Sequence, residues 1–211
     1  LLQISMQLTI ILAMAKSYYH AVKAFSEGSP IGDALGPMVA GSLIRDIDKN
    51  GTIEAIEISK DTIYQEIEFE GRTLYVVRAK GPGGTVGKPG KAIKKLVEQY
   101  GDEISRIIMI DAGLKLEGEK SGSIAMGVGA AIGGIGVEKF YIEESSAGRT
   151  IPIDALICKQ SLENAITTMS RPITNSVPEI VEKIKMGIRE RTNQGSKIIV
   201  AGIGNTIGIG V

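Results

Sequence analysis

Two hydrophobic patterns alternate along the chain and predict its helices and strands. Apolar residues recur every three or four positions in five segments, which is the spacing of a helix with one buried face; these segments are 2–26, 34–48, 91–100, 162–169 and 178–192. In seven shorter segments apolar residues alternate with polar ones or run without interruption, which is typical of strands; these are 51–59, 62–70, 72–80, 106–113, 137–145, 151–159 and 196–205. We therefore expect an α/β protein.

The order of these segments predicts the sheet. Glu70-Gly71 forms a tight turn between two alternating runs, so an antiparallel hairpin is expected around 61–79. Farther along, a helix followed by the fully apolar run at 106–110 is the rhythm of parallel α/β units, whose strands are buried on both faces. We expect a three-layer α/β/α arrangement with a mixed, mostly parallel sheet in one domain at 29–211, preceded by a separate helix at 1–28. Residues 114–136 are rich in small residues and are predicted to form a loop, with a short helix inside it as the alternative.

Composition narrows the class of partner. The chain has 24 Lys and Arg together and 24 Asp and Glu together, so its formal net charge is zero. No long-range electrostatic field is therefore expected to attract a nucleic acid. Aromatic residues make up 4% of the chain and Trp is absent, which also argues against stacking on single-stranded bases. The single cysteine, Cys158, lies in an apolar run and excludes an internal disulfide, as suits a reducing compartment. We expect a cytoplasmic protein that binds a peptide or a small molecule and no nucleic acid.

The first segment bears on membrane attachment. The chain begins LLQISM without an initiator methionine, and its uncharged opening run before Lys16 is shorter than the ~20 apolar residues of a membrane span. We expect a packed helix that stops at Gly28-Ser29-Pro30 and connects to a segment upstream of residue 1. Such a segment would hold the domain on the cytoplasmic face of a membrane. The alternative is a cytoplasmic protein with no membrane attachment. A homo-oligomer is compatible with both locations.

Candidate site residues follow the carboxyl ends of three predicted strands, where α/β sheets collect ligands. They stand after the strand at 72–80, after the buried strand at 106–110 and at the end of the last strand: Gly84, Thr85 and Gly87; Asp111 and Lys115; Gly204 and Asn205. Gly32 and Asp33 stand where the second predicted helix begins.

The glycine loop at 80–90 does not have the spacing of a phosphate-binding P-loop. A P-loop requires a glycine five residues before its Gly-Lys and a Ser or Thr after it, but Pro82 and Pro89 hold those places. A glycine loop before a helix can still bind a carboxylate, a carbonyl or a phosphate through backbone amides. The alternative is a tight connection that uses glycine for its positive φ.

Four ordered motifs resemble those of the spore germination protease family: DALGP at 33–37, the glycine loop before a helix at 81–90, IDAGLK at 110–115 and GVGAAIGG at 127–134. The strand IIVAGIGN at 198–205 resembles the one that, in that family and in the related hydrogenase maturation proteases, precedes the aspartate-bearing loop. Because it comes last here, the resemblance implies a circularly permuted phosphorylase/hydrolase-like fold in which Gly204-Asn205 returns to Gly32-Asp33. The whole chain also resembles an archaeal family of uncharacterised function.

The resemblance implies a role for two aspartates, Asp33 and Asp111, as the acid and base of a peptidase-like hydrolase. Two carboxylates in a desolvated cleft cannot both ionise cheaply, so one keeps a proton while the other can activate water. The residues expected to shape the substrate site are Gly32, Gly84, Thr85, Gly87, Lys115, Gly204 and Asn205. No cofactor and no metal are expected, because the maturation proteases bind metal through two acids and a histidine, whereas the one histidine here, His20, lies outside the motifs.

Simpler roles remain open for the same residues. Asp33 can cap the helix at 34–48, Asp111 can satisfy neighbouring amides, and Lys115 can belong to a solvated loop. In that case the fold would serve as a noncatalytic regulatory domain that binds a small molecule or a peptide.

Overall fold

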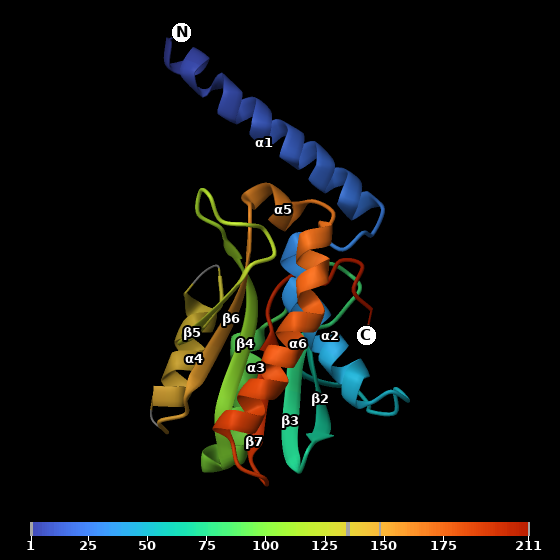
Figure 1. Cartoon of the computed structure of the whole chain (residues 1–211), viewed down its shortest axis with the longest axis vertical. Helices are drawn as coiled ribbons and strands as arrows, with labels where there is room; N and C mark the ends of the chain where they lie inside the picture. Colours follow the sequence, from blue (N-terminus) through green and yellow to red (C-terminus); the bar gives the residue numbers. More distant parts are fainter. Residues whose placement is uncertain (1, 134–135, 148, 211) are drawn as a thin grey trace.

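A mixed sheet of seven strands forms the middle layer of the protein in the residues that the computed structural model describes, 2–133, 136–147 and 149–210 (Figure 1). The strand order is β1-β2-β3-β7-β4-β6-β5. The strands are β1 (Ile56–Ser59), β2 (Thr62–Phe69), β3 (Arg72–Ala79), β4 (Ile104–Leu114), β5 (Ile124–Val128), β6 (Ile153–Gln160) and β7 (Lys197–Gly202). The pairs β3–β7, β7–β4 and β4–β6 are parallel, and the outer pairs are antiparallel. The mixed, mostly parallel sheet is thus confirmed.

Helices cover both faces of the sheet. They are α1 (Leu2–Ser26), α2 (Leu35–Ile47), α3 (Pro89–Tyr100), α4 (Val137–Ala147), α5 (Leu162–Ile166) and α6 (Arg171–Arg191), with short 3-10 turns η1 (Gly32–Ala34) and η2 (Gly101–Glu103). Side chains from α2 and α6 share one core cluster with the sheet, and those from α3 and α4 share the other. Along β4, Ile108 and Ile110 face the first cluster, whereas Ile107 and Met109 face the second, because successive side chains of a strand point to opposite faces.

The antiparallel hairpin of β2 and β3 is confirmed. Its register pairs Phe69 with Arg72, and Glu70 and Gly71 both take positive φ in the turn, at 50° and 73°, as a two-residue hairpin turn requires. The strand β7 is the last in sequence, yet it lies in the centre of the sheet between β3 and β4.

One predicted strand is wrong. Residues 137–145 belong to helix α4, in which Lys139 and Glu143 pair across one turn and Ile142 is fully buried. The apolar residues of this run do not alternate strictly, and the helix packs a single face against α3. Helical pairing of charges four residues apart therefore describes the segment better than strand alternation.

The predicted loop at 114–136 contains a strand instead of a short helix. β5 pairs antiparallel with β6, from Ile124 opposite Cys158 to Val128 opposite Asp154; residues 134 and 135 lie outside the described part. Strand β4 runs from Ile104 to Leu114, because its pairing with β6 continues to Gln160, so Asp111, which was expected to follow the buried run at 106–110, lies within the strand.

Two predicted helices have other ends in the structure. The helix predicted at 162–169 ends at Ile166, and Thr168 forms an isolated bridge with Ile31. The helix predicted to begin at Pro178 begins at Arg171 and contains that proline. Cys158, which lies in an apolar run of the sequence, is buried and free. In the described residues, no helix has both the length and the apolar character needed to cross a membrane.

Candidate functional site

The end of β7 packs directly against the segment that carries Asp33. Gly204 takes φ +137°, and a Cβ atom built there would lie 1.9 Å from the Asp33 carbonyl oxygen. Only glycine allows this approach without displacing the backbone. The predicted return of Gly204-Asn205 to Gly32-Asp33 is therefore present in the fold.

Asp33 uses its side chain to bind the last strand's loop. The amide of Asn205 donates a hydrogen bond to Asp33 Oδ2 at 3.0 Å. The residue that precedes α2 is Ala34 and no side chain caps that helix, so the alternative in which Asp33 is a helix cap is wrong. Burial raises the pKa of the Asp33 carboxyl, and the Asn205 hydrogen bond partly opposes this rise.

Asp111 lies within β4 and is buried, with 7% of its surface exposed. Its Oδ1 accepts a hydrogen bond from the Ala112 amide at 2.7 Å, and its Oδ2 accepts one from the Gly133 amide at 3.2 Å. Burial and, to a smaller extent, the negative charge of Asp33 together raise the pKa of Asp111 to about 7, against the lowering effect of the Ala112 and Gly133 hydrogen bonds. Asp111 therefore satisfies two neighbouring amides, as its simpler role requires. The charge of Asp33 also contributes to the raised pKa of the same carboxyl.

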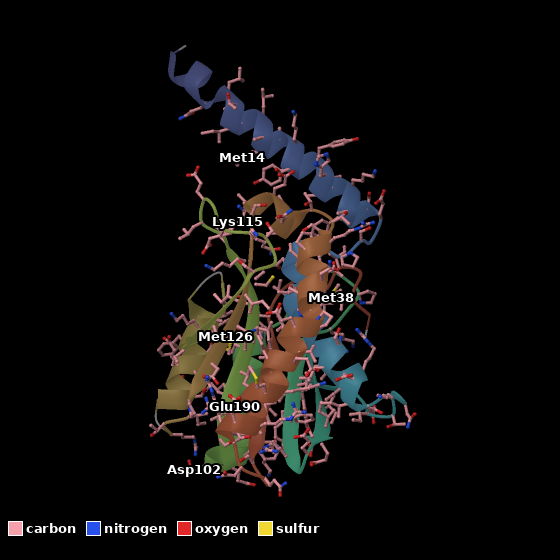
Figure 2. All side chains as sticks on the ribbon, in the orientation of Figure 1. Met14, Met38, Asp102, Lys115, Met126 and Glu190 are labelled. Carbon is pink, nitrogen blue, oxygen red and sulfur yellow. The ribbon has the colours of Figure 1, made fainter. Side chains whose placement is uncertain are left out.

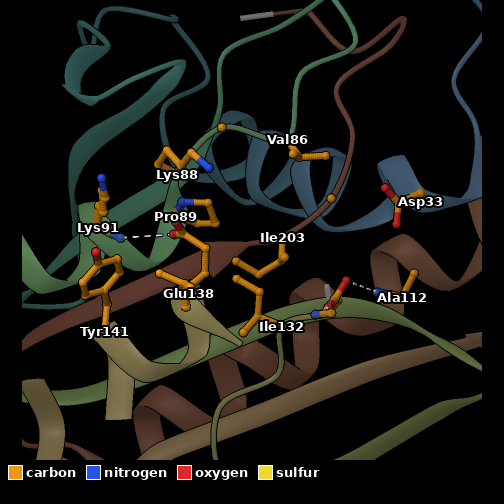
Figure 3. Close-up of a pocket in the computed structure, with 15 residues that line it drawn as sticks. Asp33, Val86, Lys88, Pro89, Lys91, Ala112, Ile132, Glu138, Tyr141 and Ile203 are labelled. Carbon is orange, nitrogen blue, oxygen red and sulfur yellow. Dashed lines mark hydrogen bonds between the residues drawn. The ribbon is translucent and has the colours of Figure 1, made fainter. Parts of the chain in front are cut away.

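Asp33 and Asp111 line one pocket of about 620 Å³ (Figure 3). Figure 3 shows Asp33 toward one end and Lys91 and Tyr141 toward the other. Val86, Ile132 and Ile203 lie between these ends and give the middle of the pocket an apolar wall. The pocket thus offers two carboxylates next to an apolar surface.

The far end of the pocket contains a residue that the sequence did not point to. Glu138, on α4, accepts hydrogen bonds from the amides of Gly90 at 2.8 Å and Lys91 at 3.3 Å, at the start of α3. A carboxylate is favoured there because the first amides of a helix lack partners within the helix. Glu138 was missed because it fell in a segment predicted as a strand, although Pro89 in the first turn of α3 indicated a helix start.

Five of the seven predicted substrate-binding residues lie at the pocket, either in its lining or in the segments that support its wall. Gly87 and Gly204 line the pocket. Gly84, Thr85 and Asn205 support its wall: Asn205 Nδ2 donates to the Gly84 carbonyl at 3.0 Å, and the Thr206 amide donates to the Thr85 carbonyl at 3.0 Å.

Gly32 and Lys115 belong to other contacts. A Cβ atom at Gly32 would lie 2.2 Å from the Asn164 carbonyl oxygen of α5. The Lys115 ammonium donates to the Glu119 carbonyl at 3.1 Å, within the loop that precedes β5. Neither residue is among those that line the pocket.

The side chains of the described residues form no group of three or more His, Cys, Asp or Glu suited to a metal ion. His20 lies exposed on α1.

Comparisons with known proteins agree with the fold. A family model described as "Domain of unknown function (DUF1512) C-terminal" matches residues 31–210, and no curated protein matches the chain at a significant level. A solved structure of peptidyl-tRNA hydrolase, in complex with N-propanol, is similar with a TM-score of 0.52 and 13% identity, over 79% of this chain and 86% of that one. The hydrolase-like α/β fold and a family of unknown function are thereby confirmed. This structural neighbour belongs to neither expected protease group, so the protease resemblance, the circular permutation and an archaeal source stay predictions.

Proposed function

Because this chain belongs to the family of DUF1512 C-terminal domains, whose description assigns no activity, we propose its function from the geometry of the site. The protein is a peptidase-like hydrolase in which Asp33 and Asp111 act as a general base and a general acid. The observation that carries this proposal is that both carboxyls line one pocket, both have raised pKa values, and the charge of Asp33 acts on Asp111.

The raised pKa of about 7 makes Asp111 the partner that keeps its proton near neutral pH. Asp33, whose Oδ2 is held by the Asn205 amide, is then the ionised partner. Two carboxyls that influence each other titrate as a pair, so the pair holds one proton over a range of pH. One proton on two carboxyls is the state needed for acid and base catalysis together.

Hydrolysis then follows a balanced path. Asp33 removes a proton from a water molecule, whose oxygen attacks the substrate carbonyl carbon. Asp111 gives its proton to the leaving nitrogen as the C–N bond breaks, which yields a carboxylic acid and an amine. The proton on Asp33 then passes to Asp111, directly or through solvent, and restores the pair.

The pocket favours a peptide or a small amide with an apolar group. Val86, Ile132 and Ile203 would contact that group beside the reacting bond. The solved neighbour is by its name a hydrolase of peptidyl-tRNA, which supports hydrolysis on this fold, whereas the balanced charge of this chain gives no reason to expect an RNA substrate.

A noncatalytic binding domain is the second candidate, and one observation favours it. Both carboxyls of the pair accept hydrogen bonds from main-chain amides, three in total, which is also how a structural carboxylate is held. Such a pocket would bind a small molecule or a peptide without turnover.

A screen for hydrolysis separates the two candidates. The chain is incubated with a library of short peptides and amides bearing apolar residues, and products are followed by mass spectrometry. We expect cleavage that falls by roughly 100- to 10,000-fold in both Asp33→Asn and Asp111→Asn, while Asp102→Asn, on an exposed aspartate that does not line the pocket, retains activity. Binding of library members without cleavage, or cleavage that survives both substitutions, would reject the proposal.

The circular permutation is supported by the contact between the two ends of the domain. A Cβ atom at Gly208 would lie 2.4 Å from the Gly28 carbonyl oxygen, so the chain returns near its end to the point where the domain begins. A permuted chain that joins residue 210 to residue 29 and opens at 51 should fold with the same pocket.

A further inference from the structure

Helix α1 extends away from the rest of the protein (Figure 1). Near its carboxyl end Ala21 and Ala24 are buried, with 8% and 0% of their surfaces exposed. Figure 2 shows Met14 on the part of α1 that stands clear of the domain. Large apolar side chains on this helix are exposed: Leu8, Ile10, Ile11, Leu12, Met14, Tyr18, Tyr19, Val22 and Phe25.

Six residues of α1 repeat at alternating intervals of three and four, which is the spacing of the inner positions of a coiled coil. They are Leu8, Ile11, Ala15, Tyr18, Val22 and Phe25, and all six are exposed; we name them the α1 seam. Leu12, Met14 and Tyr19 flank the α1 seam. Contact with lipid demands no such repeat, whereas pairing with another helix does.

Polar residues lie outside the α1 seam and repeat every seven residues, as the heptads of the α1 seam do. Thr9, Lys16 and Lys23 each follow the first seam residue of a heptad, at intervals of seven. This position faces away from a partner helix. The charges of α1 are therefore placed so that pairing leaves them in water.

The domain leaves the α1 seam accessible. Ala21 and Ala24, which are buried against the domain, precede and follow Val22 by one and two residues. On a helix with 3.6 residues per turn, Ala24 points away from the α1 seam, whereas Ala21 lies beside it, three residues after Tyr18 and four before Phe25. Over its first part, from Leu8 to Ala15, every α1 residue is exposed, so a second helix can approach the α1 seam there without meeting the domain that carries it.

The exposed area fits an interface. Eight of the large side chains on and beside the α1 seam are about half exposed. With roughly 200 Å² for each of the three aromatic ones and about 100 Å² for each of the five aliphatic ones, they present on the order of 600 Å². Specific protein interfaces begin at about 600 Å² on each partner.

We propose that the α1 seam pairs with the α1 seam of a second copy of this chain, so that the protein is a dimer joined by a coiled coil. This inference is independent of the proposed hydrolase activity. The dimer would hold two pockets on one assembly, each built from a single chain.

Two neighbouring isoleucines provide a matched test. Ile11 lies in the α1 seam and is 49% exposed, whereas Ile10 lies outside it and is 63% exposed. Sedimentation equilibrium of the 211-residue chain without lipid, from about 1 to 100 μM, should show a dimer. Ile11→Glu should weaken it on the order of 100-fold because two charges enter the seam, and Ile10→Glu should change it by less than about fivefold.

Both side chains are exposed in a single copy, so neither substitution should unfold the domain, and thermal melting checks this. A monomer at 100 μM, or equal weakening by Ile10→Glu and Ile11→Glu, would overturn the proposal. A monomer that binds anionic vesicles, and loses that binding equally in both variants, would assign the helix to a membrane surface instead and would also overturn it.

Discussion

The main-chain amide of Asn205 donates a hydrogen bond to Asp33 Oδ2 at 3.0 Å, across 172 positions of sequence. The Asn205 side chain also binds two segments, because its Nδ2 donates to the Gly84 carbonyl and its Oδ1 accepts from the Ile207 amide. A single residue after β7 thus connects an aspartate of the pocket, the glycine loop and the chain's last turn. The glycine before it sets how closely these parts approach.

Gly204→Ala should therefore disturb both stability and the site. Its Cβ would lie 1.9 Å from the Asp33 carbonyl oxygen, and φ of +137° is unfavourable for alanine. We expect the free energy of unfolding in urea to fall by about 2–4 kcal/mol.

Gly129→Ala is the control for backbone strain alone. Gly129 has φ of +113°, and no atom lies within 4 Å of a Cβ built there, so a loss of about 1 kcal/mol is expected. Equal losses in the two variants would show that the close approach of Gly204 to Asp33 is unimportant.

Asn205→Ala should loosen the glycine loop while leaving Asp33 in place. The substitution removes both side-chain hydrogen bonds but keeps the main-chain amide that binds Asp33. We expect a loss of about 1–2 kcal/mol in unfolding free energy and faster amide hydrogen exchange over residues 81–88. Asn193→Ala, on an exposed residue, should change neither quantity, and unchanged exchange in Asn205→Ala would contradict the role of this side chain.

The sheet could be predicted from local patterns, and one part of the site from a resemblance. The alternation of Ile107, Ile108, Met109 and Ile110 between two cores is a direct consequence of strand geometry. The meeting of Asp33 with Gly204 was implied by the resemblance of the motifs and their order, and not by a local pattern.

The rest depends on contacts between distant segments. Strand β5 forms only through its pairing with β6, and its weak alternation gave little signal. Glu138 belongs to the pocket only because α4 is a helix packed on α3. The cap alternative for Asp33 failed because the Asn205 amide, remote in sequence, binds that carboxylate instead.

Glu138→Gln should weaken the start of α3. The substitution removes the negative charge that accepts hydrogen bonds from the Gly90 and Lys91 amides, and a charge near a helix start contributes about 0.3–1 kcal/mol. We expect thermal unfolding to show a loss of this size that shrinks in 1 M salt. Glu179→Gln, on an exposed glutamate that pairs with the half-buried Lys183 on α6, is the control for charge removal elsewhere, and an equal, salt-independent loss there would contradict the helix-end interaction.

Asp111→Asn should flatten the dependence of stability on pH. The pKa of Asp111 is raised from an ordinary value of about 4 to about 7 in the fold, so between these values the folded chain binds more protons than the unfolded chain. The contribution of Asp111 to stability must then fall as pH rises from about 4 to about 7 and level off above it. Asparagine at position 111 does not titrate, so the Asp111→Asn variant loses this contribution. From about pH 4 to about pH 7 its unfolding free energy, relative to that of the unsubstituted protein, should rise by on the order of 4 kcal/mol, since each of about three pKa units is equivalent to about 1.4 kcal/mol.

Asp33→Asn tests whether the two carboxyls are coupled. The charge of Asp33 raises the pKa of Asp111, so its removal should lower the pKa of Asp111 and move the upper end of the pH window below 7. Urea denaturation from pH 4 to pH 8 measures both variants on the same scale. If the Asp33→Asn curve still levels off at the same pH as the unsubstituted protein, the two carboxyls titrate independently and cannot share one proton, which would remove the basis for paired acid and base catalysis in this pocket.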